Sequence, residues 1–237
     1  MDIFTVLFWI TASLTGSTFV CILGEKYGLE ITAGCVAGLA VLANILASAK
    51  ILDFSILGNA PAGVIAWSLI ALIIDIVNEL HGPKVARRII ISGFIVQLLS
   101  VSLIWIALIW NPAPFFPKEK AEAAWSVLSW APRLFGAAVL AYLFSNLFDI
   151  YVFSRIRKAT KGKHLWLRSK VSTFMSMFVS NFIFITLGFI GTTFPIITMI
   201  FGHFNIQFVI AVIDTFFLYA AVYLVRKFGM KKEGGIL

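Results

Sequence analysis

The sequence predicts an all-α fold, a polytopic integral membrane bundle of seven transmembrane helices. Of the 237 residues, 60% are hydrophobic and only 13% are charged, about half of the charged share that a soluble domain carries. The mean hydropathy is correspondingly high, at +0.98. The two cysteines, Cys21 and Cys35, lie in apolar runs and offer neither a disulfide framework nor a paired metal-ligand spacing. Composition therefore excludes a soluble enzyme, a disulfide-rich secreted domain and a disordered chain.

Seven stretches are long and apolar enough to cross a bilayer, which takes about 20 residues of helix. They cover residues 3–23, 32–50, 61–80, 89–110, 133–153, 171–192 and 205–225. The first has no basic segment before its apolar run, so we interpret it as a true span rather than a signal peptide. The second is short and rich in Ala and Gly, which suits close packing between helices. We expect one transmembrane domain over residues 1–237.

The distribution of Lys and Arg predicts the orientation of the spans. With seven spans, 15 of the 19 basic residues fall on one side, seven of them in the loop 154–170. The other side holds Lys50, Lys118, Lys120 and Arg133. Because positive charge collects in the cytoplasm, we expect the N-terminus outside and the C-terminus inside. The net charge of +8 then reflects topology and anionic lipid rather than a nucleic-acid partner.

The longest external connection is residues 111–132. The three prolines at its start, within residues 111–117, stop the preceding helix. Trp125 and Trp130 follow at the expected level of the membrane interface, where aromatic residues gather. We interpret the second half as a short amphipathic helix on the outer surface, with a gate as the alternative.

Ionisable and amide side chains also occur inside the spans, where they are costly unless they face a cavity or a partner. Asp75, Asn78 and Glu79 share one face of the third span through their i, i+3, i+4 spacing. The other candidates are Asn44, Gln97, Asn146, Asp149, Ser176, Asn181, Gln207 and Asp214. Three spans each carry an aspartate, and no basic residue lies deep in a span. This pattern favours a shared polar cavity over separate ion pairs.

Each candidate also has a structural alternative. Asn44, Gln97 and Ser176 could serve only as hydrogen-bond partners between helices. Glu79 could pair at the interface with Arg87 or Arg88.

Common catalytic signatures are absent from the sequence. There is no GxSxG nucleophile elbow, HExxH zinc motif or Walker A phosphate loop. The histidines, His81, His164 and His203, are far apart, and we expect them in loops or at helix ends rather than as metal ligands. The last span has no mid-helix lysine for a retinal Schiff base. We therefore expect neither an enzyme nor a cofactor or metal site.

Two long motifs stand out in the chain. The first is Leu42-Ala43-Asn44-Ile45-Leu46-Ala47 with Lys50, followed by Asp75-Ile76-Val77-Asn78-Glu79-Leu80-His81-Gly82-Pro83-Lys84-Val85-Ala86-Arg87-Arg88. The second is Ser145 to Asp149, then Arg157-Lys158, His164-Leu165-Trp166-Leu167-Arg168 and Ser172-Thr173. In this order and spacing, over about residues 40–215, they resemble the vitamin uptake transporter family, whose members are also called queuosine-precursor transporters.

The chain departs from the pattern of that family at several positions, so it resembles a somewhat divergent member. Ile74 stands where the family has Thr, and His81 where it has an aromatic residue. Asn146 replaces a Gln and keeps the amide. Ser180 stands in place of a repeated carboxylate, with Asn181 beside it. These changes lie where substrate would be held, so they bear on the substrate more than on membership.

The resemblance implies import of a queuosine or archaeosine precursor, a 7-deazaguanine-type base, across the cytoplasmic membrane by a secondary transporter or facilitator. A guanine-like edge offers a ring N–H and an amino group that one carboxylate accepts together, while a neighbouring amide contacts the adjacent carbonyl. The substrate-binding candidates are Asn44, Asp75, Asn78, Glu79, Asn146, Asp149, Asn181 and Asp214. The gate or interface candidates, which could instead only anchor the helices, are Lys50, Arg87, Arg88 and Arg168.

Two other classes of function stay open at this point. One is a membrane subunit that captures a vitamin or nucleobase for a separate energising complex. The other is a membrane scaffold or enzyme whose buried polar groups are structural. The expected partners are a small purine-like base and the lipid bilayer, and not nucleic acid. The coupling ion and assembly into a homo-oligomer are left open.

Overall fold

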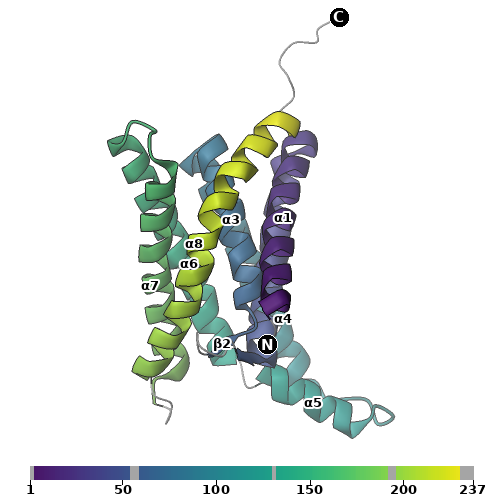
Figure 1. Cartoon of the computed structure of the whole chain (residues 1–237). Helices are drawn as coiled ribbons and strands as arrows, with labels where there is room; N and C mark the ends of the chain where they lie inside the picture. Colours follow the sequence, from purple (N-terminus) through teal and green to yellow (C-terminus); the bar gives the residue numbers. More distant parts are fainter. Residues whose placement is uncertain (1–2, 54–58, 130–131, 192–195, 230–237) are drawn as a thin grey trace, which may run out of the picture.

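The computed structural model describes residues 3–53, 59–129, 132–191 and 196–229. Long helices form a bundle, with one short helix and a two-stranded hairpin at one end (Figure 1). The helices are α1 (Ile3–Tyr27), α2 (Leu29–Ala49), α3 (Val64–His81), α4 (Pro83–Ile109), α5 (Lys118–Ser129), α6 (Pro132–Ala159), α7 (Leu165–Phe189) and α8 (Ile196–Phe228). Between α2 and α3, β1 (Ile51–Asp53) pairs antiparallel with β2 (Asn59–Pro61).

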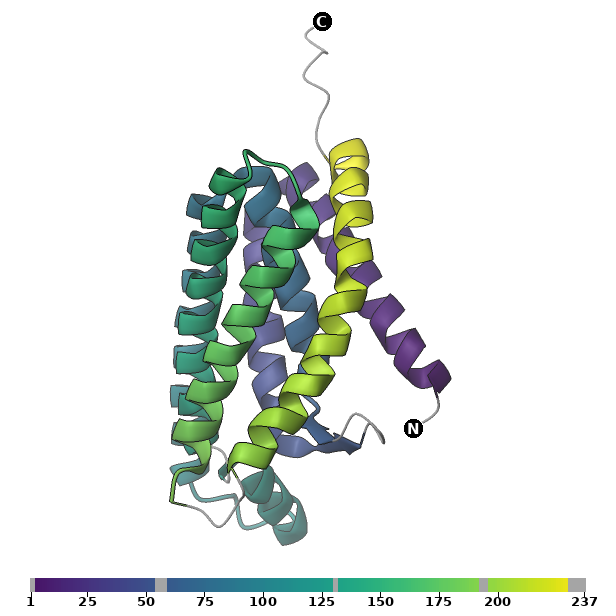
Figure 2. The same cartoon turned by 60° about the vertical axis from the view of Figure 1, so that its left-hand side comes forward.

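The long helices alternate in direction along the chain. The turns α1–α2, α3–α4 and α6–α7 therefore gather at one end, together with the last turn of α8 (Figure 2). We call this the basic end, after Lys26, Lys84, Lys161 and Lys227. The hairpin and α5 lie at the opposite end, the hairpin end. This is the division of loops that the count of Lys and Arg requires for seven spans. That the basic end faces the cytoplasm stays a prediction.

The turn between α3 and α4 shows how the sequence sets the reversals. Gly82 ends α3 with φ 80°, and its N–H donates to the Asn78 carbonyl. This left-handed conformation strains any residue with a side chain, but not glycine. Pro83 then starts α4 at a position where no backbone N–H is needed. The two residues together let the chain reverse without a loop.

Six of the described helices, α1, α2, α3, α4, α6 and α7, are long and apolar enough to cross a membrane. A seventh span is obtained if the two parts of α8, Ile200–Ile213 and Phe217–Phe228, count as one; they meet at 47°. Large apolar side chains such as Leu103, Phe178 and Tyr223 are exposed on the bundle, as expected for helices surrounded by lipid. The predicted all-helical membrane bundle is confirmed. The small hairpin is an addition that the sequence did not predict.

Helix α3 is the core of the bundle, because it packs against α1, α2, α4, α6 and α8. Its residues Ile70, Ile73 and Ile76 are fully buried. At its start, Gly63 approaches the Ala43 carbonyl of α2 so closely that an added Cβ would lie 2.3 Å from that oxygen. The polar side chains of α3 consequently face protein rather than lipid, and they must find partners inside the bundle.

Candidate functional site

A cavity of about 130 Å³ lies in the half of the bundle nearer the hairpin end. This is several times the roughly 30 Å³ that one water molecule takes up in the liquid, so there is room for an organic ligand. Most of its wall is apolar. Its polar lining comes from α2, α3, α6, α7 and α8, namely Asn44, Trp67, Ser68, Ser145, Asn146, Asp149, Thr173, Ser176, Ser180, Asn181, His203 and Gln207.

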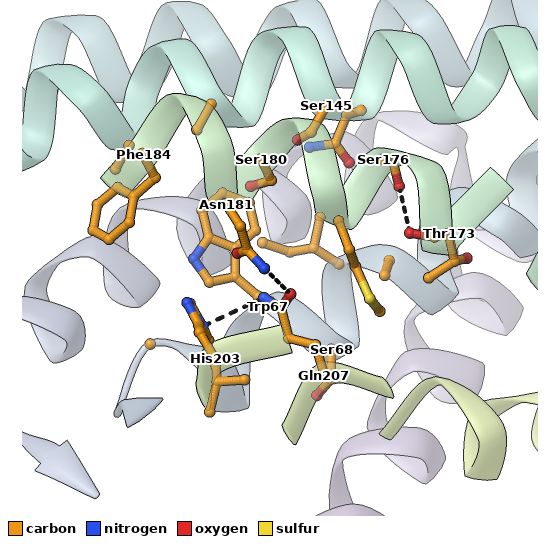
Figure 3. A pocket seen from close by; sticks show the side chains of 18 of the residues that line it. Trp67, Ser68, Ser145, Thr173, Ser176, Ser180, Asn181, Phe184, His203 and Gln207 are labelled. Carbon is orange, nitrogen blue, oxygen red and sulfur yellow. Dashed lines mark hydrogen bonds between the residues drawn. The ribbon is translucent and has the colours of Figure 1, made fainter. Parts of the chain in front are cut away.

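Helix α7 contributes a polar stripe to the cavity (Figure 3). Thr173, Ser176 and Ser180 follow one another at intervals of three and four, which places them on one helical face. The Ser176 hydroxyl lies 3.0 Å from the Thr173 carbonyl and 3.2 Å from Oδ1 of Asp149. The stripe thereby presents the Ser176 hydroxyl to a carboxylate on the neighbouring helix α6.

Asp149 on α6 is the acidic side chain of the cavity wall among the residues that the structure describes. It is buried, and Ser172 and Ser176 are among its hydrogen-bond partners. Asn146 lies one turn earlier on the same helix and is half-buried; its amide donates to the Tyr142 carbonyl across 2.7 Å. A carboxylate and an amide thus line the cavity side by side, as their i, i+3 spacing predicts.

A second polar group joins α7 to α8 across the cavity (Figure 3). The Asn181 amide donates to Oε1 of Gln207 across 3.1 Å, and the Gln207 amide donates to Nε2 of His203 across 3.4 Å. His203 was expected in a loop or at a helix end. That expectation is wrong, because α8 begins at Ile196 and carries His203 inside the helix. Its spacing of four from Gln207 is the signal that could have placed it on the same face.

Two aromatic side chains supply flat apolar surface to the cavity. Trp67 on α3 and Phe184 on α7 both line it. The Trp67 ring also packs against Tyr142, with centroids 5.3 Å apart and planes tilted by 42°. Rings of this kind can stack on a planar ligand.

Asn44 on α2 serves two purposes. Its amide donates to Oε1 of Gln97 on α4 across 2.6 Å, which is the structural bond between helices considered above. The residue also lines the cavity. Gln97 is buried as well and lies outside the cavity wall.

The acidic face of α3 lies between the cavity and the basic end. Asp75 accepts a hydrogen bond of 2.7 Å from Ser169 and is also a hydrogen-bond partner of Asp149. Asn78 is buried, its carbonyl accepts from Arg157 across 3.2 Å, and its side-chain amide has no hydrogen-bond partner among the described residues. Asp75, Asn78 and Glu79 do not belong to the cavity wall. They form a separate polar face of α3 beside it.

Glu79 forms an ion pair, but with an arginine that is distant in the sequence. Nη2 of Arg168 lies 2.5 Å from Oε2 of Glu79. Arg87 and Arg88, the alternative partners considered from the sequence, are exposed on α4, because Ala86, Ile89 and Ile90 take the side of that helix that faces the core. Arg168 lies in the first turn of α7 and is itself buried, so an arginine does lie inside the bundle.

Three further candidates, Lys50, Arg87 and Arg88, do not belong to the cavity wall. Lys50 is exposed at the hairpin end, where its backbone N–H caps α2 by donating to the Leu46 carbonyl. Arg87 and Arg88 are exposed at the basic end. The side chain of Asp214 lies outside the described part of the structure, although its backbone belongs to α8. No group of three or more His, Cys, Asp or Glu side chains that could hold a metal ion occurs among the described residues.

A known protein family matches the part of the chain that contains most of the residues lining the cavity. The family described as "Putative vitamin uptake transporter" matches residues 61–221, which include α3, α6 and α7. A protein of Bacillus subtilis (strain 168), named "Probable queuosine precursor transporter", is 29% identical over 167 residues, 69% of this chain and 72% of the relative. No solved structure matches the chain.

Proposed function

The chain belongs to the vitamin uptake transporter family, and we propose that it carries a queuosine precursor, a 7-deazaguanine-type base, across the cytoplasmic membrane. Membership in a transporter family makes it a carrier rather than an enzyme. The proposed route passes through the cavity between α3, α6, α7 and α8. The substrate class follows the name of the Bacillus subtilis relative and is supported by the chemistry of the cavity.

The observation that carries the proposal is the buried carboxyl group of Asp149 in a largely apolar cavity. A carboxylate in such surroundings is costly unless donors or a cation face it. The serine hydroxyls of α7 supply some of the donors. A guanine-like edge would supply two more, a ring N–H and an amino group held side by side, which one carboxylate accepts in a bidentate way.

The other walls suit the remaining surfaces of such a base. Asn146, Asn181 and Gln207 offer amide donors and acceptors for a ring carbonyl and ring nitrogen atoms. Trp67 and Phe184 offer surfaces on which the planar ring can stack. A small set of polar groups in an apolar cavity is the usual form of a small-molecule site.

The test is uptake of a radiolabelled 7-deazaguanine base into liposomes that contain only the purified chain. Asp149→Asn removes the charge and one acceptor, and it should weaken binding by roughly 10- to 100-fold, since a hydrogen bond to a charged group contributes about 1.5–3 kcal/mol. Glu122→Gln, exposed on α5, is the matched control and should behave as the unmodified chain. Unlabelled guanine should compete better than adenine, because adenine lacks the N–H and amino edge.

Two outcomes would count against the proposal. If Asp149→Asn binds the base as tightly as the control, the carboxylate does not hold it. If the purified chain binds the base but never moves it, a capture subunit for a separate energising complex is the better description.

A further inference from the structure

Two carboxyl groups from different helices meet beside the cavity. Asp149 on α6 belongs to the cavity wall, and Asp75 on α3 is among its hydrogen-bond partners. Both residues are buried, with 5% of Asp75 and 8% of Asp149 exposed. We call these two residues the carboxyl pair.

Hydroxyl groups from α7 complete the surroundings of the carboxyl pair. Ser169 donates to Oδ2 of Asp75 across 2.7 Å, and Ser176 donates to Oδ1 of Asp149 across 3.2 Å. Ser172 is a further partner of Asp149. Three serines on one helix thus support both carboxyl groups at once.

The helices that carry the pair and its serines also hold charged groups toward the basic end, and three of these are paired with one another. They are Glu79 on α3, Arg157 on α6 and Arg168 on α7. On the opposite side, α8 contributes the titratable His203, which lines the same cavity and accepts a hydrogen bond from Gln207. The pair therefore lies between a closed ion-pair cluster and an accessible cavity.

Hydrogen bonding between two carboxyl groups has a chemical requirement. An ionised carboxylate only accepts hydrogen bonds, so a bond between Asp75 and Asp149 needs a proton on one of them. With that proton, the pair carries one negative charge instead of two in surroundings of low dielectric, where like charges repel strongly. The serine hydroxyls then donate to the other oxygens. The contact has the form of a binding site for a single proton.

We propose that Asp75 and Asp149 bind one proton that crosses the membrane together with the base. The inference rests on the proposed transport function and identifies its driving ion. A proton from the cavity side forms an O–H bond on Asp75, and this O–H donates to Asp149. Each oxygen of Asp149 has more than one lone pair, so the two oxygens can also accept the two N–H groups of the base edge. Proton and base therefore bind more tightly together than either does alone.

Release follows from the position of the pair between helices. When the basic end opens, α3 separates from α6 and α7, and the bond between the two carboxyl groups breaks. The O–H bond of Asp75 then ionises, and its proton enters the solution on that side. The only covalent bond of the protein that is made and broken is this O–H bond, so one positive charge moves with each molecule of base.

The experiment uses the purified full chain in liposomes with a labelled 7-deazaguanine base. Exchange of base at equal pH on both sides measures transport itself. Uptake under an inward proton gradient, with the membrane potential clamped, measures coupling. The unmodified chain should accumulate base several-fold above the external concentration, and addition of base should make the external solution more alkaline.

The variants separate coupling from transport. In Asp75→Asn the ratio of gradient-driven uptake to exchange should fall to about one, whatever its absolute rate. Asp75→Glu retains a protonatable group, so its ratio should stay above one; this variant decides the matter if Asp75→Asn does not fold. Glu30→Gln, exposed at the start of α2, is the control and should keep the full ratio.

Each outcome has a separate meaning. Exchange without proton movement, acidification of the external solution, or a full ratio in Asp75→Asn would overturn the proton site and leave the proposed function standing. Absence of both exchange and uptake in the unmodified chain would overturn the proposed function and the proton site with it.

Discussion

Arg168 and Glu79 form a buried ion pair at the basic end, in which Nη2 of Arg168 donates to Oε2 of Glu79 across 2.5 Å. Only 1% of Arg168 and 9% of Glu79 is exposed. Nη1 of Arg168 also donates to the carbonyls of Gly162 and Lys163, across 2.8 and 3.1 Å, in the turn between α6 and α7. Arg157 approaches the same carboxylate to 4.0 Å. The pair joins α3 to α6 and α7, and it closes the bundle on the side of the carboxyl pair away from the cavity.

Removing one partner of this ion pair should destabilise the protein strongly. Glu79→Gln would leave the buried charge of Arg168 without its carboxylate, and Arg168→Gln would leave Glu79 with only the more distant Arg157, at 4.0 Å. Loss of one partner of a buried ion pair costs about 3–5 kcal/mol. The apparent Tm of each single variant, measured in detergent, should therefore fall far below that of Arg88→Gln, an exposed position on α4. The double variant should recover part of the loss, since neither charge remains. If the decrease in apparent Tm of the double variant equals the sum of the two single decreases, the two residues do not stabilise each other.

The bond between Asn44 and Gln97 allows the two roles of Asn44 to be separated. Asn44→Leu and Gln97→Leu both remove it, and bonds of this kind between membrane helices contribute about 0.6 kcal/mol on average. We expect small and similar decreases in apparent Tm. Only Asn44 lines the cavity, so only Asn44→Leu should raise the KM for the base, by several-fold. Equal KM values in the two variants would leave Asn44 with a structural role alone.

The helical bundle could be predicted from the sequence because the membrane leaves the backbone few choices. Apolar stretches long enough to span lipid must form helices, which satisfy their own N–H and C=O groups. The resemblance to the vitamin uptake transporter family is confirmed by the match over residues 61–221. The i, i+3 spacing of Asn146 and Asp149 also placed both residues on one helical face, and both line the cavity.

Contacts between helices could not be predicted in the same way. Arg87 and Arg88 are near Glu79 in the sequence, yet α4 turns them outward, while Arg168 reaches Glu79 from 89 residues away. The spacing of residues in the sequence shows which of them share a face of one helix, but it does not show which faces of two helices pack together. His203 was missed for a different reason. The predicted span began at residue 205, whereas the helix extends back to Ile196 and into the cavity wall.

Because α2 packs closely on α3, replacing Gly63 by alanine should lower the stability of the protein, whereas the same replacement at Gly38 should not. Gly63→Ala would place a Cβ 2.3 Å from the backbone oxygen of Ala43, and overpacking of this kind costs about 1–3 kcal/mol. Gly38→Ala on α2 is the matched control, because an added Cβ there has no neighbour within 4 Å. We expect Gly63→Ala to lower the apparent Tm, and Gly38→Ala to keep or raise it, since alanine favours a helix by up to about 1 kcal/mol. A tolerated alanine at position 63 would mean that α2 and α3 can separate without cost.

The chain of bonds from Asn181 through Gln207 to His203 makes His203 a candidate contact for the base, although the sequence did not indicate it. His203→Phe keeps a ring of similar size and removes the hydrogen-bonding nitrogens. It should raise the KM for the base by roughly tenfold, the equivalent of one lost hydrogen bond of about 1.4 kcal/mol. The apparent Tm should stay close to that of Asn205→Ala, an exposed position on the same helix that serves as the control. An unchanged KM in His203→Phe would place the base nearer to α6, against Asp149 and Asn146, and away from α8.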